Sequence, residues 1–185
     1  MIKKLVKLAS VGILFLVLAG CQTATIIDLY HPETEKLEIS EAVFTDEAYE
    51  PFRAGGALFT PYTVQTQVGT GEEAYDKYAL HLGVYKLNEF TESVVINHVK
   101  VTGTEDMNFS ERNQELALPI EFSNDSIASS NVILLDEISA DNMGLSEKSI
   151  IKIVLNVSVV ENGETITKDL SYDFVTRLRT YQVQR

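Results

Sequence analysis

Hydrophobic and polar residues alternate with a period of two along most of this chain, as they do in strands that bury one face. From Gln22 onward no long apolar stripe repeats at helical spacing, and only Glu137–Lys148 is predicted to hold a short helical turn. Runs rich in β-branched and aromatic residues predict strands at Ala24–Tyr30, Leu37–Phe44, Ala57–Val68, Lys77–Leu87, Ser93–Thr102, Gln114–Phe122, Asn131–Leu135, Ser149–Val160 and Thr165–Tyr181. The pattern therefore predicts an all-β protein.

The pair Asn162-Gly163 separates the last two predicted strands, and Asn-Gly favours the two positive φ angles of a type I′ hairpin turn. If Glu161 opposes Glu164, one face of the hairpin is apolar and the other is polar. The apolar face then pairs Val159 with Ile166, Leu155 with Leu170, Ile153 with Tyr172 and Ile151 with Phe174. The polar face pairs Ser158 with Thr167, Asn156 with Asp169 and Lys152 with Asp173.

A second hairpin is predicted across residues 88–91, with Lys77–Leu87 paired to Ser93–Thr102. This register places His81 opposite His98, and it leaves Leu82 opposite Asn97 as the one mismatch in an apolar face. Two long hairpins with further strands at this turn spacing favour a two-sheet antiparallel β-sandwich of the immunoglobulin-like or transthyretin-like type. The chain lacks the cysteine pair and the tryptophan that mark antibody domains.

The first 21 residues differ from the rest of the chain. Three lysines precede an uncharged run, Leu8–Gly20, which is shorter than the roughly 20 residues that span a bilayer. The run ends in Leu18-Ala19-Gly20-Cys21, where the small residues suit a peptidase cleft and the thiol is the nucleophile that accepts a diacylglycerol group. This segment resembles the signal peptide of bacterial lipoproteins. An uncleaved membrane helix and a buried core helix are the alternatives.

The resemblance implies three parts: a signal peptide at 1–20, the lipidated Cys21 with a short tether or first strand at 21–35, and the β-sandwich domain at 36–185. It also implies a lipid anchor in the bacterial cell membrane or outer membrane, with the domain facing the periplasm or the exterior.

Removal of residues 1–20 takes away three lysines and no acid, so the formal net charge falls from −12 to −15. Such a charge repels nucleic acid and anionic lipid, which leaves the acyl chains to hold the protein at the membrane.

The residues that carry chemistry are few. No Gly-x-Ser-x-Gly motif occurs, and the only thiol is assigned to the lipid, so we predict no catalytic activity and no cofactor. His81 and His98, as cross-strand neighbours, are candidate ligands for a transition metal. The acidic loop Asp136–Asp141 with Asn142 offers oxygen ligands that suit calcium, but its order differs from an EF-hand loop. We interpret both groups as solvated side chains and predict no metal.

Aromatic residues gather around an arginine in one connection that also holds Gly55-Gly56 and two prolines. Aromatic and arginine side chains are typical of protein-binding surfaces. The candidate contact residues are Tyr49, Phe52, Arg53, Phe59 and Tyr62, with Phe52 and Arg53 as the anchors. Packing of these aromatics into the core is the alternative.

The sequence therefore predicts a lipid-anchored protein that binds or scaffolds another envelope component without catalysis of its own. The expected partners are the membrane, through the lipid, and an envelope protein, and nucleic acid is not among them. The alternative function is a small envelope enzyme or metal-binding protein that uses His81 and His98 or the acidic loop.

Overall fold

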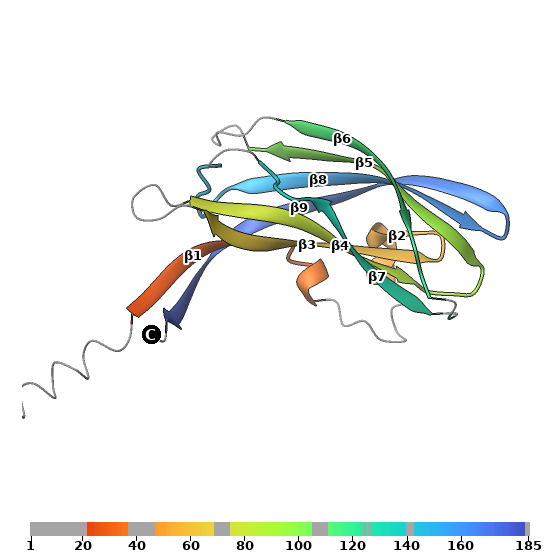
Figure 1. Ribbon diagram of the computed structural model, residues 1–185, viewed down its shortest axis with the longest axis horizontal. Coiled ribbons are helices and arrows are strands. Elements are labelled where there is room, and N and C mark those ends of the chain that lie inside the picture. Colours follow the sequence, from red (N-terminus) through yellow and green to blue (C-terminus); the bar gives the residue numbers. More distant parts are fainter. Residues whose placement is uncertain are drawn as a thin grey trace, which may run out of the picture. The chain divides into compact units, whose positions relative to one another are not determined.

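The computed structural model describes residues 22–36, 47–68, 75–104, 111–123, 125, 127–139 and 143–183 (Figure 1). The described residues divide into two compact units, a large one within Leu29–Arg177 and a small one that combines residues 22–28 with 178–183. Within the small unit, Arg179 Nε lies 2.9 Å from Asp28 Oδ2. The predicted lipidation at Cys21 and the predicted strand Leu37–Phe44 lie outside the described residues.

The strands form two antiparallel sheets, which confirms the predicted two-sheet β-sandwich. The five-stranded sheet has the order β1 (Gln22–Tyr30), β9 (Glu164–Val183), β8 (Ile150–Glu161), β5 (Thr91–Gly103) and β6 (Arg112–Ile120). The four-stranded sheet has the order β2 (Arg53–Ala54), β3 (Ala57–Val68), β4 (Tyr75–Lys86) and β7 (Ala128–Leu135). Every predicted strand that falls on described residues forms. The short strand β2 and the 3-10 helices η1 (Thr34–Lys36) and η3 (Glu47–Phe52) were not predicted.

The β8–β9 hairpin has the predicted register throughout, from Glu161 opposite Glu164 to Ile151 opposite Phe174. Both turn residues have positive φ, 51° at Asn162 and 76° at Gly163, as a type I′ turn requires. The apolar face is buried over most of its length, while Lys152 and Asp173 are exposed on the other side. The Asn-Gly turn and the alternation of apolar and polar residues together therefore determine this register.

The predicted pairing of Lys77–Leu87 with Ser93–Thr102 is wrong, because β4 and β5 lie in different sheets. The link between them turns at Asn88, whose side chain accepts hydrogen bonds from the backbone N–H groups of Phe90 and Thr91, each at 3.0 Å. Alternation places the same residues inward whether two strands share a sheet or face each other across the core. The pattern alone therefore did not identify the partner strand.

The mismatch at Asn97 marks a real irregularity. The register of β5 against both of its neighbours shifts between Ile96 and His98, which is a β-bulge around Asn97. The bulge turns Asn97 to the polar side, where its Nδ2 donates to Asn156 Oδ1 at 2.6 Å and to Ser158 Oγ at 2.9 Å. The single break in the apolar face was thus the signal of a bulge.

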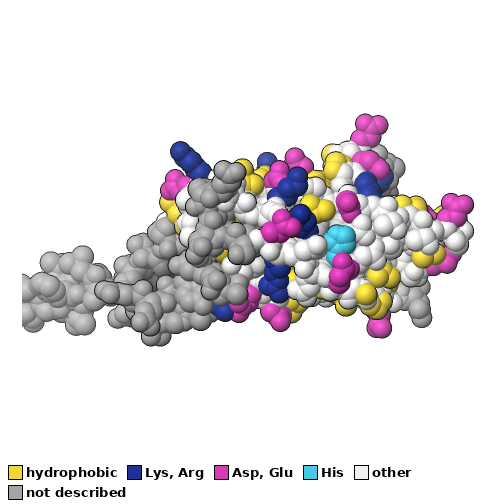
Figure 2. Space-filling model, turned by 90° about the horizontal axis from the view of Figure 1, so that it is seen from above, with side chains coloured by type: hydrophobic (Ala, Val, Ile, Leu, Met, Phe, Trp, Pro, Cys, Tyr) yellow, Lys and Arg dark blue, Asp and Glu magenta, His cyan; other side chains and the backbone are white. Residues whose placement is uncertain are grey.

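The core lies between the two sheets and is built from aliphatic and aromatic side chains, the largest being Tyr172, Phe59 and Phe174. The Tyr172 hydroxyl donates to the Phe59 carbonyl oxygen at 3.0 Å and so links β9 to β3 across the core. Burial raises the pKa of the Tyr172 phenol, which keeps it a neutral donor. On the face shown in Figure 2, hydrophobic side chains appear as separate spots among polar and charged ones.

The helical turn predicted at Glu137–Lys148 is wrong for the described part of that segment. Ile138 is buried and its backbone N–H donates to the Tyr78 carbonyl at 2.7 Å, which holds the chain against β4. Further on, the N–H of Ser149 donates to the Ser146 carbonyl at 3.2 Å and closes a tight turn. Tertiary contacts have overridden the weak local preference for a helix.

Candidate functional site

The predicted anchor Phe52 is not on the surface. It ends η3 and is only 2 % exposed, because its ring turns inward and stacks on Tyr172 with 5.6 Å between centroids. Phe59, on the inner face of β3, is completely buried. The prediction that Phe52 serves as an exposed anchor is therefore wrong, and the alternative of core packing is correct for both phenylalanines.

The other three candidate contact residues differ in their exposure and in what they contact. Tyr49 is half-buried and packs against the core. Arg53 Nη2 donates to Glu50 Oε2 at 2.5 Å within the protein. Tyr62 is 42 % exposed on the outer face of the four-stranded sheet, where its ring lies 5.3 Å from that of His81.

The predicted metal ligands are not brought together. His81 belongs to β4 and His98 to β5, so the two histidines lie in different sheets and are not cross-strand neighbours. In the acidic loop, Asp136 is exposed and Glu137 forms an ion pair with Lys77, while Asp141 lies outside the described residues.

The structure instead has a hollow beside His31, a residue for which the sequence offered no role. The hollow has a volume of about 340 Å³ and lies where the chain leaves β1 and enters η1. Its wall is formed by three segments that are far apart in the sequence: His31, Pro32 and Glu33 after β1, Pro51 and Phe52 of η3, and Ser171, Asp173 and Val175 of β9. We call it the His31 pocket.

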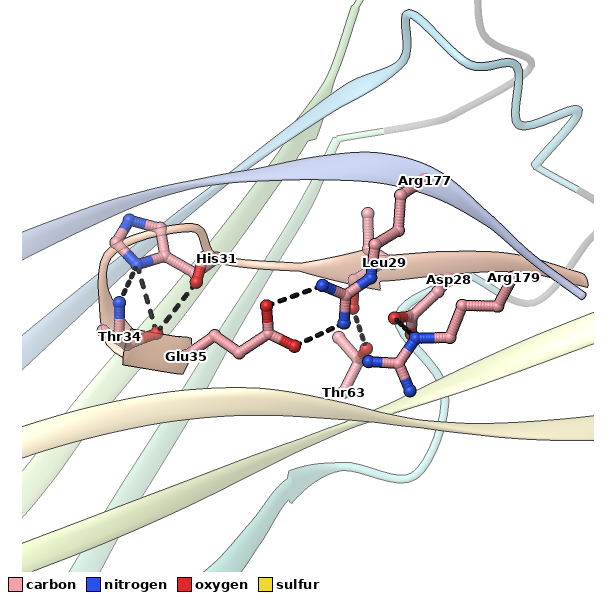
Figure 3. A network of polar contacts seen from close by, with 8 residues as sticks. All are labelled: Asp28, Leu29, His31, Thr34, Glu35, Thr63, Arg177 and Arg179. Atoms are coloured by element: carbon pink, nitrogen blue, oxygen red, sulfur yellow. Dashed lines mark hydrogen bonds and ion pairs between the residues drawn. The ribbon is translucent and has the colours of Figure 1, made fainter. Parts of the chain in front are cut away.

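The imidazole of His31 is fixed in place and is 7 % exposed. Its Nδ1 accepts a hydrogen bond from the backbone N–H of Thr34 at 3.1 Å, so the neutral ring carries its proton on Nε2. The ring contacts Phe52 and Tyr172 edge to face, with centroid distances of 5.5 Å and 5.4 Å. In Figure 3 the second ring nitrogen points away from Thr34. Among the described residues, Nε2 has no hydrogen-bond partner.

Three further contacts hold the turn around His31 against strands β9, β1 and β3. Arg177 donates to both carboxylate oxygens of Glu35, with 2.7 Å between Nη1 and Oε2 (Figure 3). Its guanidinium also lies 3.9 Å from the centroid of the Tyr30 ring. Thr63 Oγ1 donates to the Leu29 carbonyl at 2.5 Å and ties the end of β1 to β3. The turn that carries His31 is therefore held in place by contacts from β9 and from β3.

Glu33 and Asp173 give the pocket a negative charge. Neither carboxylate forms an ion pair with any described residue, whereas Glu35 nearby is neutralised by Arg177. Burial lowers the pKa of His31, although the charges of Glu33 and Asp173 act in the opposite direction. The pocket thus combines two carboxylates that form no ion pair with a described residue, a neutral imidazole, and the side chains of Pro51 and Phe52, an arrangement that favours a cationic group with an apolar stem.

The buried imidazole should make the protein less stable in mild acid. Because burial lowers the folded-state pKa of His31 below its ordinary 6.5, the unfolded chain binds a proton first, and stability falls as the pH drops below about 6.5. Unfolding by urea should show a larger loss between pH 7.5 and pH 5.5 in the wild type than in His31→Asn, whose side-chain oxygen can still accept from Thr34. If the free energy of unfolding depended on pH in the same way in the two proteins, His31 would not contribute to the loss of stability in acid.

The described part of the chain contains no group of three His, Cys, Asp or Glu side chains placed to share a metal ion. It also contains no helix that is both long and apolar enough to cross a membrane. Comparison with protein-family models, with curated proteins and with solved structures finds no match for this chain.

Proposed function

We propose that this chain is a bacterial lipoprotein whose β-sandwich binds another component of the cell envelope and catalyses no reaction itself. The sequence Leu18-Ala19-Gly20-Cys21 after a lysine-rich start supports the lipid anchor. The −15 charge of the chain after residue 20 supports it as well, because such a chain has little electrostatic attraction to an anionic membrane. The anchored protein is expected to face the periplasm or the exterior.

The observation that carries a binding role is the His31 pocket. Two carboxylates, Glu33 and Asp173, which form no ion pair with a described residue, line a hollow beside the neutral imidazole of His31 and the side chains of Pro51 and Phe52. A cationic group would gain Coulomb attraction from Glu33 and Asp173, and an aliphatic stem would lie against the apolar wall. The ligand that fits this chemistry is a lysine or arginine side chain of an envelope protein.

Titration of the full chain in detergent micelles with Nα-acetyl-lysine amide tests this ligand class. The imidazole proton signals of His31, followed by NMR, should shift to saturation, while the uncharged Nα-acetyl-norleucine amide should leave them unchanged. Exposed ion pairs contribute about 0.2–1 kcal/mol, so Asp173→Asn or Glu33→Gln should weaken binding up to about five-fold. Glu164→Gln removes the same charge at the exposed β8–β9 turn and should have no effect.

Equal shifts from the charged and the uncharged amide would overturn the ligand class. Unchanged affinity in both pocket variants, or an equal loss in Glu164→Gln, would show that net charge and not the pocket attracts the amine. Either result would remove the His31 pocket from the proposed function and leave the lipid anchor to be tested separately.

A further inference from the structure

The imidazole of His31 and the two carboxylates of the His31 pocket act on one another. Burial lowers the pKa of the ring, while the charge of Glu33 on the same turn and the charge of Asp173 on β9 both raise it. A cationic side chain in the pocket would be attracted by the same two carboxylates, because all three residues line the hollow. A proton on His31 and a bound cation therefore draw on the same negative charge.

The other charged and titratable groups on the segments packed against the ring have partners elsewhere. They are two ion pairs, one ammonium group and one phenol: Glu35 with Arg177, Glu50 with Arg53, Lys168 and Tyr172. Lys168 donates to the Arg53 carbonyl oxygen at 2.8 Å, and Glu47 lies with Lys168 beside a second hollow on the other side of Pro51. Among the described residues, Glu33 and Asp173 are thus the carboxylates whose charge reaches the ring of His31.

The ring of His31 can take up a proton without leaving its place. In the neutral form its Nδ1 accepts from the backbone N–H of Thr34, and protonation of Nδ1 removes this acceptor. The hydroxyl oxygen of Thr34 lies 3.1 Å from the same nitrogen and can accept the new N–H. The charge of the pocket can therefore change while the turn that carries His31 keeps its position.

We propose that protonation of His31 releases the cationic side chain, so that the pocket holds its partner at neutral pH and lets it go in mild acid. This inference rests on the proposed function, because it takes a lysine or arginine side chain as the ligand. The coupling is reciprocal: a proton that weakens ligand binding by some factor is itself bound more weakly, by the same factor, when the ligand is present. The ligand should therefore lower the pKa of His31.

Titration of the full chain in detergent micelles with Nα-acetyl-lysine amide at pH 7.5 and pH 5.0 tests the release. The ammonium group of this probe stays charged at both pH values. The affinity of the wild type should be about threefold or more lower at pH 5.0, a size typical of one charge at a partly exposed site. Saturating probe should also move the midpoint of the pH titration of the His31 ring signals down by about 0.5, which corresponds to the same factor.

His31→Asn is the decisive variant, because it keeps both carboxylates and an acceptor for Thr34 but cannot be protonated. Its affinity should change less than that of the wild type, since protonation of the carboxylates would weaken binding in both proteins alike. His81→Asn makes the same substitution on the outer face of the other sheet and should show the wild-type fall. Near-ultraviolet circular dichroism at pH 5.0 reports whether each protein is still folded.

The possible outcomes separate the release from the proposed function. Binding at pH 7.5 with equal affinity at pH 5.0 would overturn the release and leave the proposed ligand class standing. An equal fall in His31→Asn, or a loss of binding in the wild type that accompanies unfolding, would also overturn the release. Absence of binding at pH 7.5 would overturn the proposed ligand class and the release with it.

Discussion

Replacement of Ile153 by alanine is expected to lower the free energy of unfolding by about 2–5 kcal/mol. Ile153 is completely buried on the inner face of β8, opposite Tyr172 of β9 and Val101 of β5. The substitution removes three carbon atoms from a close-packed sheet face, and the neighbouring strands can collapse only partly into the cavity. This loss is a large fraction of the total stability of a domain of this size.

Ile150→Ala is the matched control on the same strand. Its side chain is 41 % exposed, so the same chemical change should alter the free energy of unfolding by no more than about 0.5–1 kcal/mol. Urea unfolding followed by circular dichroism measures both variants under one condition. Similar losses of stability in Ile153→Ala and Ile150→Ala would mean that the odd-numbered residues of β8 are not buried. That result would contradict the β-sandwich.

Replacement of Cys21 by serine is expected to abolish lipid attachment completely. The hydroxyl of serine is a much weaker nucleophile than the thiolate, so the diacylglycerol transfer that precedes cleavage should not occur. Cells that produce Cys21→Ser should accumulate the uncut precursor and incorporate no labelled palmitate into this chain. Gln22→Ser introduces a serine beside the intact cysteine and should be labelled and cut like the wild type. Normal cleavage of Cys21→Ser after Gly20 would refute the lipoprotein interpretation.

The strands and one hairpin could be predicted because short-range physics determines them. Alternation identifies which residues face inward, and Asn162-Gly163 determines the turn that sets the β8–β9 register. The partner of β4 could not be predicted, because its inner residues bury equally well in a shared sheet and in a facing sheet. The choice depends on contacts between strands that are distant in the sequence, such as Gly83 of β4 opposite Asn131 of β7.

The candidate site was missed for a similar reason. His31 is one of three histidines, and the sequence places it only beside Pro32 after a strand. Its significance comes from Phe52 and Tyr172, which reach it from segments that are far away in the sequence. The connection that holds Phe52 and Arg53, by contrast, was predicted to be a binding surface because of its aromatic and arginine residues. Composition does not reveal that Phe52 points inward. Pro32, as a signal that the strand ends and the chain turns, was the only local indication of the site.

The intact mass of the mature wild-type protein tests the proposed lipid anchor most directly. The chain should be purified from the membranes of a bacterium that processes lipoproteins and then measured by mass spectrometry. The proposed function predicts a chain that begins at Cys21 and carries the added mass of a diacylglycerol group, with or without a further acyl chain on the amine. A mass that equals the unmodified chain, whether it begins at Met1 or after the leader, would contradict it.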